Sequence, residues 1–126
     1  MHFIVIDSNY NVFGHYHNGV INTNDKNNYD LTFIFSLYSN WRCEIKKFKN
    51  KDFVYIRICD NNDFYDCGDG YYGDFNCYCI REINKNNCFV HSDISISFDI
   101  DDPKTFTESC FPTKFTTKRV IVIEMN

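Results

Sequence analysis

Seven cysteines supply the most reactive side chains of this 126-residue chain. Cys77 and Cys79 are two residues apart in a segment that alternates like a strand, so both thiols should point to one face of a sheet. Cys88 and His91 follow after a short loop rich in asparagine. Thiolates and imidazoles are the ligands that zinc prefers in proteins. One hypothesis is therefore a zinc site formed by Cys77, Cys79, Cys88 and His91.

Other interpretations of the cysteines stay open beside the zinc site. Cysteine is among the residue types most often buried, so the favoured interpretation is that these thiols are reduced and packed in the core. Disulfides are a further alternative, although seven cysteines leave at least one thiol outside any intramolecular pairing. A catalytic Cys–His pair made of Cys88 and His91 would require an accessible, reactive thiol.

An acidic, glycine-containing segment at residues 60–76 predicts a long irregular loop. Calcium takes six to eight oxygen ligands from tightly turning loops, and this segment offers both carboxylates and turn residues. The EF-hand pattern is absent, because no glycine stands at loop position 6 and no glutamate at position 12. A solvated acidic loop is the plainer interpretation and a calcium site the alternative. The candidate ligands are Asp60, Asp63, Asp66, Asp69 and Asp74.

The same segment also carries aromatic side chains, which suggests a contact surface for a protein or a sugar. The alternative is that the segment folds back and buries its own rings. The aromatic residues in question are Phe64, Tyr65, Tyr71, Tyr72 and Phe75.

His15 and His17 could also hold a metal, because residues two positions apart on a strand point to the same face. The favoured interpretation, however, is that both imidazoles are exposed at the edge of a loop. The sequence contains no Gly-x-Ser-x-Gly, Walker or dinucleotide-binding motif. These observations together favour a protein that is not an enzyme.

The elements that must position these residues are mostly strands. The chain has no alanine and two leucines, whereas the residues that favour strands are plentiful. The clearest alternation covers residues 93–100 and predicts a half-buried antiparallel strand. Further strands are predicted at 3–6, 12–16, 41–46, 53–59, 77–83 and 120–123, with tight turns at 7–11, 49–52 and 84–87.

Residues 30–38 are ambiguous, because their apolar residues fit a strand and also one stripe of a helix. The content of β-branched and aromatic residues favours the strand. The predicted fold is therefore a single all-β domain over residues 1–126, an antiparallel β-sandwich or Greek-key barrel of about eight strands. The alternative is an α+β domain with one helix near residues 30–41.

Charge is unevenly distributed along a chain whose net charge is −4. Residues 59–103 carry 10 acidic and 2 basic side chains, whereas Arg42, Lys46, Lys47, Lys49 and Lys51 form a short basic stretch. The acidic balance argues against general nucleic-acid binding. No apolar run is long enough to span a membrane.

Location and source are expectations drawn from composition. No signal-peptide pattern and no glycosylation motif is present, which favours the cytoplasm or a virion, with a secreted mature fragment as the alternative. The 16 asparagines and 14 isoleucines have AT-rich codons, which favours an AT-rich genome such as that of a large DNA virus.

Three functions are ranked on these grounds. The first is a non-enzymatic binding or structural module, virus-encoded, that associates with itself or with a protein partner. The second is a metal- or calcium-dependent ligand-binding domain that uses the acidic segment 60–76. The third is a small enzyme that depends on a cysteine or a metal.

Overall fold

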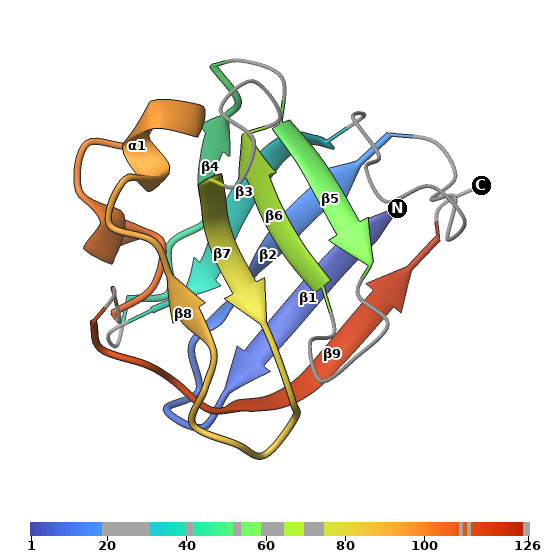
Figure 1. Cartoon of the computed structure of the whole chain (residues 1–126), viewed down its shortest axis with the longest axis vertical. Coiled ribbons are helices and arrows are strands. Elements are labelled where there is room, and N and C mark those ends of the chain that lie inside the picture. The colour runs from blue at the N-terminus through green and yellow to red at the C-terminus, as the bar shows by residue number, and fades with distance from the viewer. Residues whose placement is uncertain are drawn as a thin grey trace.

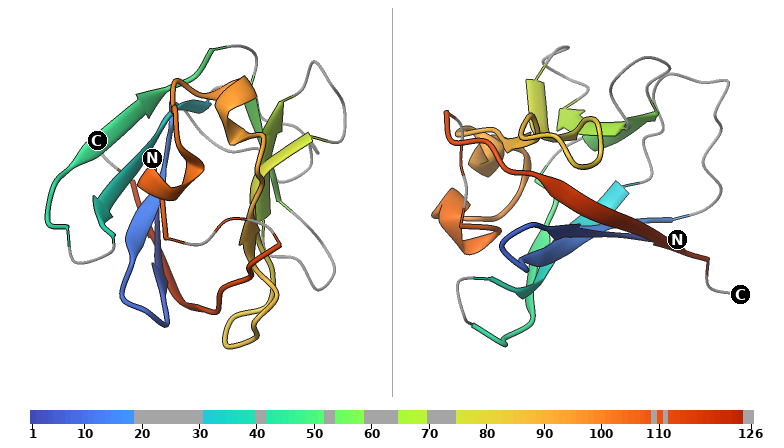
Figure 2. Two further views of the ribbon diagram at one scale, coloured as in Figure 1. Left: turned by 90° about the vertical axis from the view of Figure 1, so that its left-hand side faces the viewer. Right: turned by 90° about the horizontal axis from the view of Figure 1, so that it is seen from below.

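Two antiparallel sheets form the molecule and pack face to face (Figures 1 and 2). This computed structural model describes residues 1–18, 31–39, 42–51, 54–58, 65–69, 75–108, 110 and 112–124, without the side chains of 31, 32, 54, 55, 57, 58, 65–69 and 75–77. The five-stranded sheet has the order β4-β3-β2-β1-β9 and the four-stranded sheet the order β5-β6-β7-β8. The predicted all-β sandwich is confirmed, and the described strands of the two sheets do not close into a barrel.

The chain forms four strands of the first sheet, then all strands of the second, and returns to the first sheet with its last strand. The five-stranded sheet contains β1 (His2–Asp7), β2 (Val12–His17), β3 (Leu31–Tyr38), β4 (Lys46–Lys49) and β9 (Thr117–Ile123). The four-stranded sheet contains β5 (Val54–Ile58), β6 (Tyr65–Asp69), β7 (Phe75–Ile80) and β8 (Phe89–Val90). Two short helices, α1 (Ile94–Ser97) and η1 (Pro103–Thr105), lie between β8 and β9 in the sequence.

The first hairpin is confirmed at the predicted turn. The Asp7 carboxylate accepts hydrogen bonds from the backbone N–H groups of Asn9 and Asn11, both at 2.9 Å, and from the Asn11 amide at 2.8 Å. Tyr10 takes a positive φ of 65° inside this turn. The carboxylate therefore satisfies the backbone donors that a tight turn leaves unpaired.

β3 resolves the ambiguity at residues 30–38 in favour of the strand. It pairs with β2 on one side and with β4 on the other. Ile34 lies in the core between the sheets, whereas Phe33 and Phe35 contact rings on the opposite face. The alternative with a helix near residues 30–41 is therefore wrong, because the backbone pairs along both edges of the strand.

The predicted strand at residues 93–100 is wrong. Residues Ile94–Ser97 form α1, whose backbone includes a hydrogen bond from the Phe98 N–H to the Ile94 carbonyl. This turn places Ile94 and Phe98 together in the core and leaves Ile96 47% exposed. The apolar residues at 94 and 98 fit the four-residue period of one helical turn as well as they fit strand alternation.

The predicted strand at 41–46 is wrong over its described residues except Lys46, where β4 begins. Cys43, Glu44 and Ile45 have no strand pairing, and Ile45 is 74% exposed. The turn at 49–52 is also not a hairpin, because β4 and β5 belong to different sheets. Instead, the Lys51 N–H donates to the Ser97 carbonyl, and the Asp99 N–H donates to the Lys49 carbonyl, both at 2.8 Å. The residues directly after α1 therefore pair with the end of β4, at the edge of the five-stranded sheet.

Residues 60–76 are not irregular throughout, contrary to the prediction. Tyr65–Asp69 form β6, which pairs with β5 on one side and β7 on the other. Aspartate and glycine have low strand propensity, so pairing on both edges overrides the local preference. The hairpin at 84–87 between β7 and β8 is confirmed, with Asn84 at a φ of 67°.

The core between the sheets combines aromatic rings with aliphatic side chains. The Phe13 ring meets the rings of Phe106, Phe115 and Tyr78 edge to face, with centroids 5.0, 5.5 and 6.1 Å apart. Phe13 comes from the five-stranded sheet and Tyr78 from the four-stranded sheet. These edge-to-face contacts are the favoured geometry for aromatic rings and join the two layers.

Candidate functional site

The residues of the predicted zinc site lie on two faces of the four-stranded sheet. Cys79 is opposite Phe89 in the β7–β8 pairing, so Cys88, the next residue, belongs to the other face. Cys88 lies in the core with Ile80 and Val90, and His91 is half-buried. The side chain of Cys77 is outside the described residues. Within the described residues, no three His, Cys, Asp or Glu side chains gather as a metal site.

Hydrogen bonds hold the Cys88 thiol in the core. Its sulfur accepts from the Arg81 N–H and from the Thr117 hydroxyl, both at 3.3 Å, and the thiol lies 3.8 Å from the Asn87 amide oxygen. The side chain is fully buried. These contacts agree with the interpretation of Cys88 as a packed, reduced thiol.

The predicted calcium ligands and aromatic contact residues fall mostly outside the described part of the chain. Asp66, Asp69 and Tyr65 belong to β6 and Phe75 to β7, and their side chains are not described. The remaining residues of both predictions lie outside the described residues, namely Asp60, Asp63, Asp74, Phe64, Tyr71 and Tyr72.

The interpretation of His15 and His17 as exposed imidazoles is wrong. Both side chains point from β2 into the space between the sheets and are at most 1% exposed. The His15 ring stacks on Phe3 at 4.6 Å, and its Nδ1 is hydrogen-bonded to the Tyr78 hydroxyl. Burial holds the pKa of His15 well below its usual value, with smaller contributions from the charges of His17, the amino terminus and His2. His15 is therefore a neutral core residue at neutral pH.

We expect the depressed pKa of His15 to make the protein less stable in mild acid. Below about pH 6.5, His15 takes up a proton in the unfolded state, whereas in the folded state it does so only at lower pH. Protonation therefore favours the unfolded state, so the stability of the fold is at its full value above pH 6.5 and decreases below it. The free energy of unfolding should fall by about 1.4 kcal/mol per pH unit below that value. Urea denaturation at pH 7.5 and 5.5 measures the loss. The variant His15→Gln should lose clearly less, and an equal loss in both proteins would contradict this assignment.

The most distinctive surface lies on the opposite side of the five-stranded sheet. We call it the outer face, because it is turned away from the four-stranded sheet (Figure 2). Alternation puts Phe3, Phe13 and Ile34 in the core and their neighbours along each strand on the outer face. The outer face carries His2, Ile4, Tyr16, Phe33, Phe35, Lys47, Lys49, Arg119, Ile121 and Ile123.

A row of rings crosses the outer face over three strands. The rings of Tyr16 and Phe33 stack with centroids 5.2 Å apart and an interplanar angle of 21°. His2 lies 4.7 Å from Tyr16 and 6.1 Å from Phe35, and Phe33 lies 6.3 Å from Phe35. Strand register explains the row, because His2 pairs with Tyr16 and Tyr16 pairs with Phe33. Such cross-strand aromatic pairs stabilise a sheet and fix the positions of the rings.

Positive charge borders the ring row at both edges of the sheet. The Lys47 ammonium lies 4.0 Å above the Phe33 ring, and Lys49 pairs with Phe33 in the strand register. At the other edge, Arg119 is exposed and pairs with Ile6. Ile121 is 36% exposed and Ile123 is 42% exposed next to it. The outer face is thus an apolar, partly aromatic surface with basic margins.

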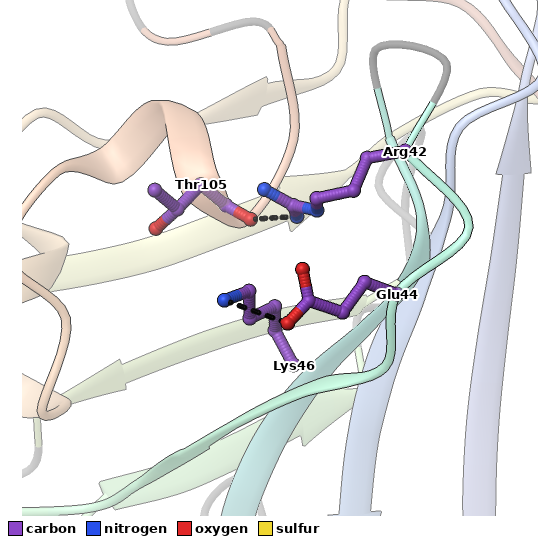
Figure 3. A network of polar contacts seen from close by, with 4 residues as sticks. All are labelled: Arg42, Glu44, Lys46 and Thr105. Carbon is purple, nitrogen blue, oxygen red and sulfur yellow. Dashed lines mark hydrogen bonds and ion pairs between the residues drawn. The ribbon is translucent and has the colours of Figure 1, made fainter.

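The basic stretch of the sequence divides between two roles. The Arg42 guanidinium donates to the Thr105 carbonyl at 2.9 Å, and the Lys46 ammonium lies 3.2 Å from the Glu44 carboxylate (Figure 3). Lys51 donates to the Ser95 carbonyl at 3.0 Å. The Lys46–Glu44 contact is local, whereas the bonds of Arg42 and Lys51 connect the residues on either side of β4 to η1 and α1. Lys47 and Lys49 remain on the outer face.

Sequence reasoning missed this surface although its signal was present. A sheet with one wet face should alternate apolar and polar residues, yet β1 is apolar at four consecutive positions, Phe3–Ile6, and β3 is apolar or aromatic at six of its eight positions. The second apolar face of these strands indicates a surface that contacts another molecule.

No family model matches this chain, and no curated protein or solved structure matches it. No helix among the described residues is long and apolar enough to cross a membrane.

Proposed function

We propose that this domain is a non-enzymatic protein-binding module and that the outer face is its contact surface. The observation that carries the proposal is the ring row, held by strand register on a face that no described helix or strand covers. Its His2, Tyr16 and Phe33 rings are half-buried, whereas Phe35 is 6% exposed and supports them. Aromatic side chains are enriched at protein interfaces, and rigid strands present them at little entropic cost.

The chemistry of the outer face favours one class of partner. Ile4, Ile121 and Ile123 extend the rings with aliphatic surface, which fits an apolar protein segment better than the stacked bases of a nucleic acid. Lys47 and Lys49 at one edge and Arg119 at the other favour acidic groups at the rim of the partner. The partner is therefore a protein segment with an apolar centre and flanking Asp or Glu residues.

The composition supports a further part of this proposal. The abundance of residues with AT-rich codons fits a virus-encoded protein that serves in a virion or contacts a host protein. A non-enzymatic binding module suits either role, and the outer face supplies the contact in both.

A peptide library tests the proposal without knowledge of the partner. We expect a displayed library selected on the purified protein to yield peptides with aromatic or aliphatic centres and acidic flanks. The variant Phe33→Ser should weaken binding of the selected peptide by about tenfold or more, because an aromatic centre of an interface often contributes over 1 kcal/mol. The pair Lys47→Glu and Lys49→Glu should weaken it mainly through the association rate.

Matched controls come from the hairpin between β7 and β8. Ile83 is 41% exposed and Lys85 is exposed, and both lie away from the outer face. Ile83→Ser and Lys85→Glu should leave the affinity unchanged, as measured by fluorescence anisotropy of the labelled peptide. Binding that survives Phe33→Ser would contradict the proposal. A single-stranded oligonucleotide that binds more tightly than the peptide would replace it with a nucleic-acid surface.

A further inference from the structure

The edge of the five-stranded sheet at β9 is a separate feature from the outer face. β9 pairs with β1 on one side, and no described strand lies on its other side (Figure 1). Ile121, Val122 and Ile123 are 36%, 47% and 42% exposed in this strand. Proteins usually protect such an edge with charges, proline or a covering loop, because a long apolar edge strand pairs readily with another strand.

The hydrogen bonds of the sheet show which groups of β9 face outward. The paired residues Met1 and His17 exchange both backbone hydrogen bonds at 2.9 Å, and Asp7 bonds to Asn11 in the same register. Odd-numbered residues of β1 therefore bond to β2, and even-numbered residues bond to β9. Because Ile4 pairs with Ile121, the N–H and C=O groups of Val120 and Val122 point to the free edge.

We propose that two copies of this protein join through β9, antiparallel, about a twofold axis at Ile121. Val120 of each copy then lies opposite Val122 of the other, and the outward backbone groups of both residues form paired hydrogen bonds. The two five-stranded sheets become one continuous sheet of ten strands. An antiparallel strand paired with itself generates this twofold symmetry, so each copy uses the same surface.

Charge complementarity identifies a second copy as the occupant of this edge. Lys118, at the irregularity near the start of β9, and Glu124, directly after its last residue, are both exposed and flank the apolar centre of the strand. In the register centred on Ile121, Lys118 of each copy faces Glu124 of the other, which gives two opposite-charge pairs. Registers displaced by two residues also satisfy the backbone, but they leave these charges without opposite partners. β-branched side chains fill the centre, as is favourable for cross-strand pairs.

The dimer also extends the outer face, although it does not depend on the proposed binding function. Ile121 of each copy lies on the outer face beside the axis, so the two outer faces join into one surface. A partner with two binding segments would then gain effective concentration from the pair.

Sedimentation velocity from about 1 to 100 µM protein tests the dimer, a range that covers weak to moderate self-association. We expect the wild-type protein to dimerise in this range. In Val122→Pro the dissociation constant of the dimer should rise between about tenfold and a hundredfold, because proline removes an outward N–H from each copy. This substitution spares the ladder to β1, since the lost donor points away from it. Ile96→Ser is the control, because Ile96 is as exposed as Val122 but lies in α1.

A charge exchange tests the register even if Val122→Pro does not fold. Lys118→Glu and Glu124→Lys should each weaken the dimer, because each places like charges opposite one another. The double variant should restore the wild-type dissociation constant, since it recreates both pairs in reversed order. A wild-type protein that stays monomeric at 100 µM, or a double variant weaker than either single variant, would overturn the proposal.

Discussion

Replacing Gly14 by alanine is expected to cost at least about 3 kcal/mol of stability and to lower the melting temperature by roughly 10 °C. A Cβ at Gly14 would lie 1.8 Å from the Phe3 carbonyl oxygen and 2.9 Å from its carbon. Overpacking costs about 1–3 kcal/mol when side chains can move aside. Here the obstacle is the backbone of a neighbouring strand, which pairs with β2 and β9 and cannot rotate away.

The position of Gly14 also matters for the ring row on the outer face. The tip of the Phe35 ring lies 3.1 Å from where this Cβ would stand, so the ring covers the glycine. Aromatic side chains commonly compensate in this way for a glycine within a sheet. Gly14→Ala should therefore displace Phe35 as well as destabilise the hairpin.

Thermal denaturation followed by circular dichroism measures the effect of Gly14→Ala. Val12→Ala is the matched control, because Val12 is half-buried on the same strand and loses only two methyl groups. It should cost about 1 kcal/mol. If Gly14→Ala is as stable as Val12→Ala, the close approach of β1 to Gly14 is wrong.

Tyr78→Ala is expected to cost about 3–5 kcal/mol, as is usual when a buried aromatic ring is removed. Tyr78 is fully buried and its ring lies 5.5 Å from that of Phe106 and 6.1 Å from that of Phe13. Its hydroxyl is hydrogen-bonded to His15 of the opposite sheet. The side chain therefore supplies both packing and a polar link between the two layers.

Tyr78→Phe separates these two contributions. The ring remains and the hydroxyl is lost, so we expect a cost of about 1–2 kcal/mol from the polar contact alone. Urea denaturation of the three proteins at pH 7.5 gives the two values. Equal losses for Tyr78→Phe and Tyr78→Ala would mean that the packing of the ring contributes nothing, contrary to the aromatic core described above.

The strands of the first hairpin were predictable because local pattern and tertiary role agree there. β1 and β2 are rich in β-branched and aromatic residues, and Asp7 and Asn11 lie where the turn between them needs polar side chains. The segment 93–100 shows the opposite case. Its apolar residues satisfy two periods, and packing against β7 and the end of β4 selects the helical turn. Such a choice depends on contacts that are distant in sequence.

The candidate site was missed for a related reason. The spacing of His15 and of the cysteines suggests metal or catalytic sites, whereas His15 and Cys88 are buried in the core. The rings of His2, Tyr16 and Phe33 come from three strands and gather only through the register of the sheet. Alternation predicts which residues share a face within one strand, but not which strands are neighbours. The sequence of β3 therefore does not show that its rings join those of β1 and β2 on one face.

NMR can locate the selected peptide on the folded protein and so show whether the outer face is the contact surface. Amide shifts in a ¹⁵N-labelled sample are followed as the peptide is added. We expect the largest changes on the outer face, at His2, Tyr16, Phe33 and Lys47 and at their strand neighbours. Changes centred instead on the hairpin at residues 84–87 or on the acidic segment 60–76 would contradict it.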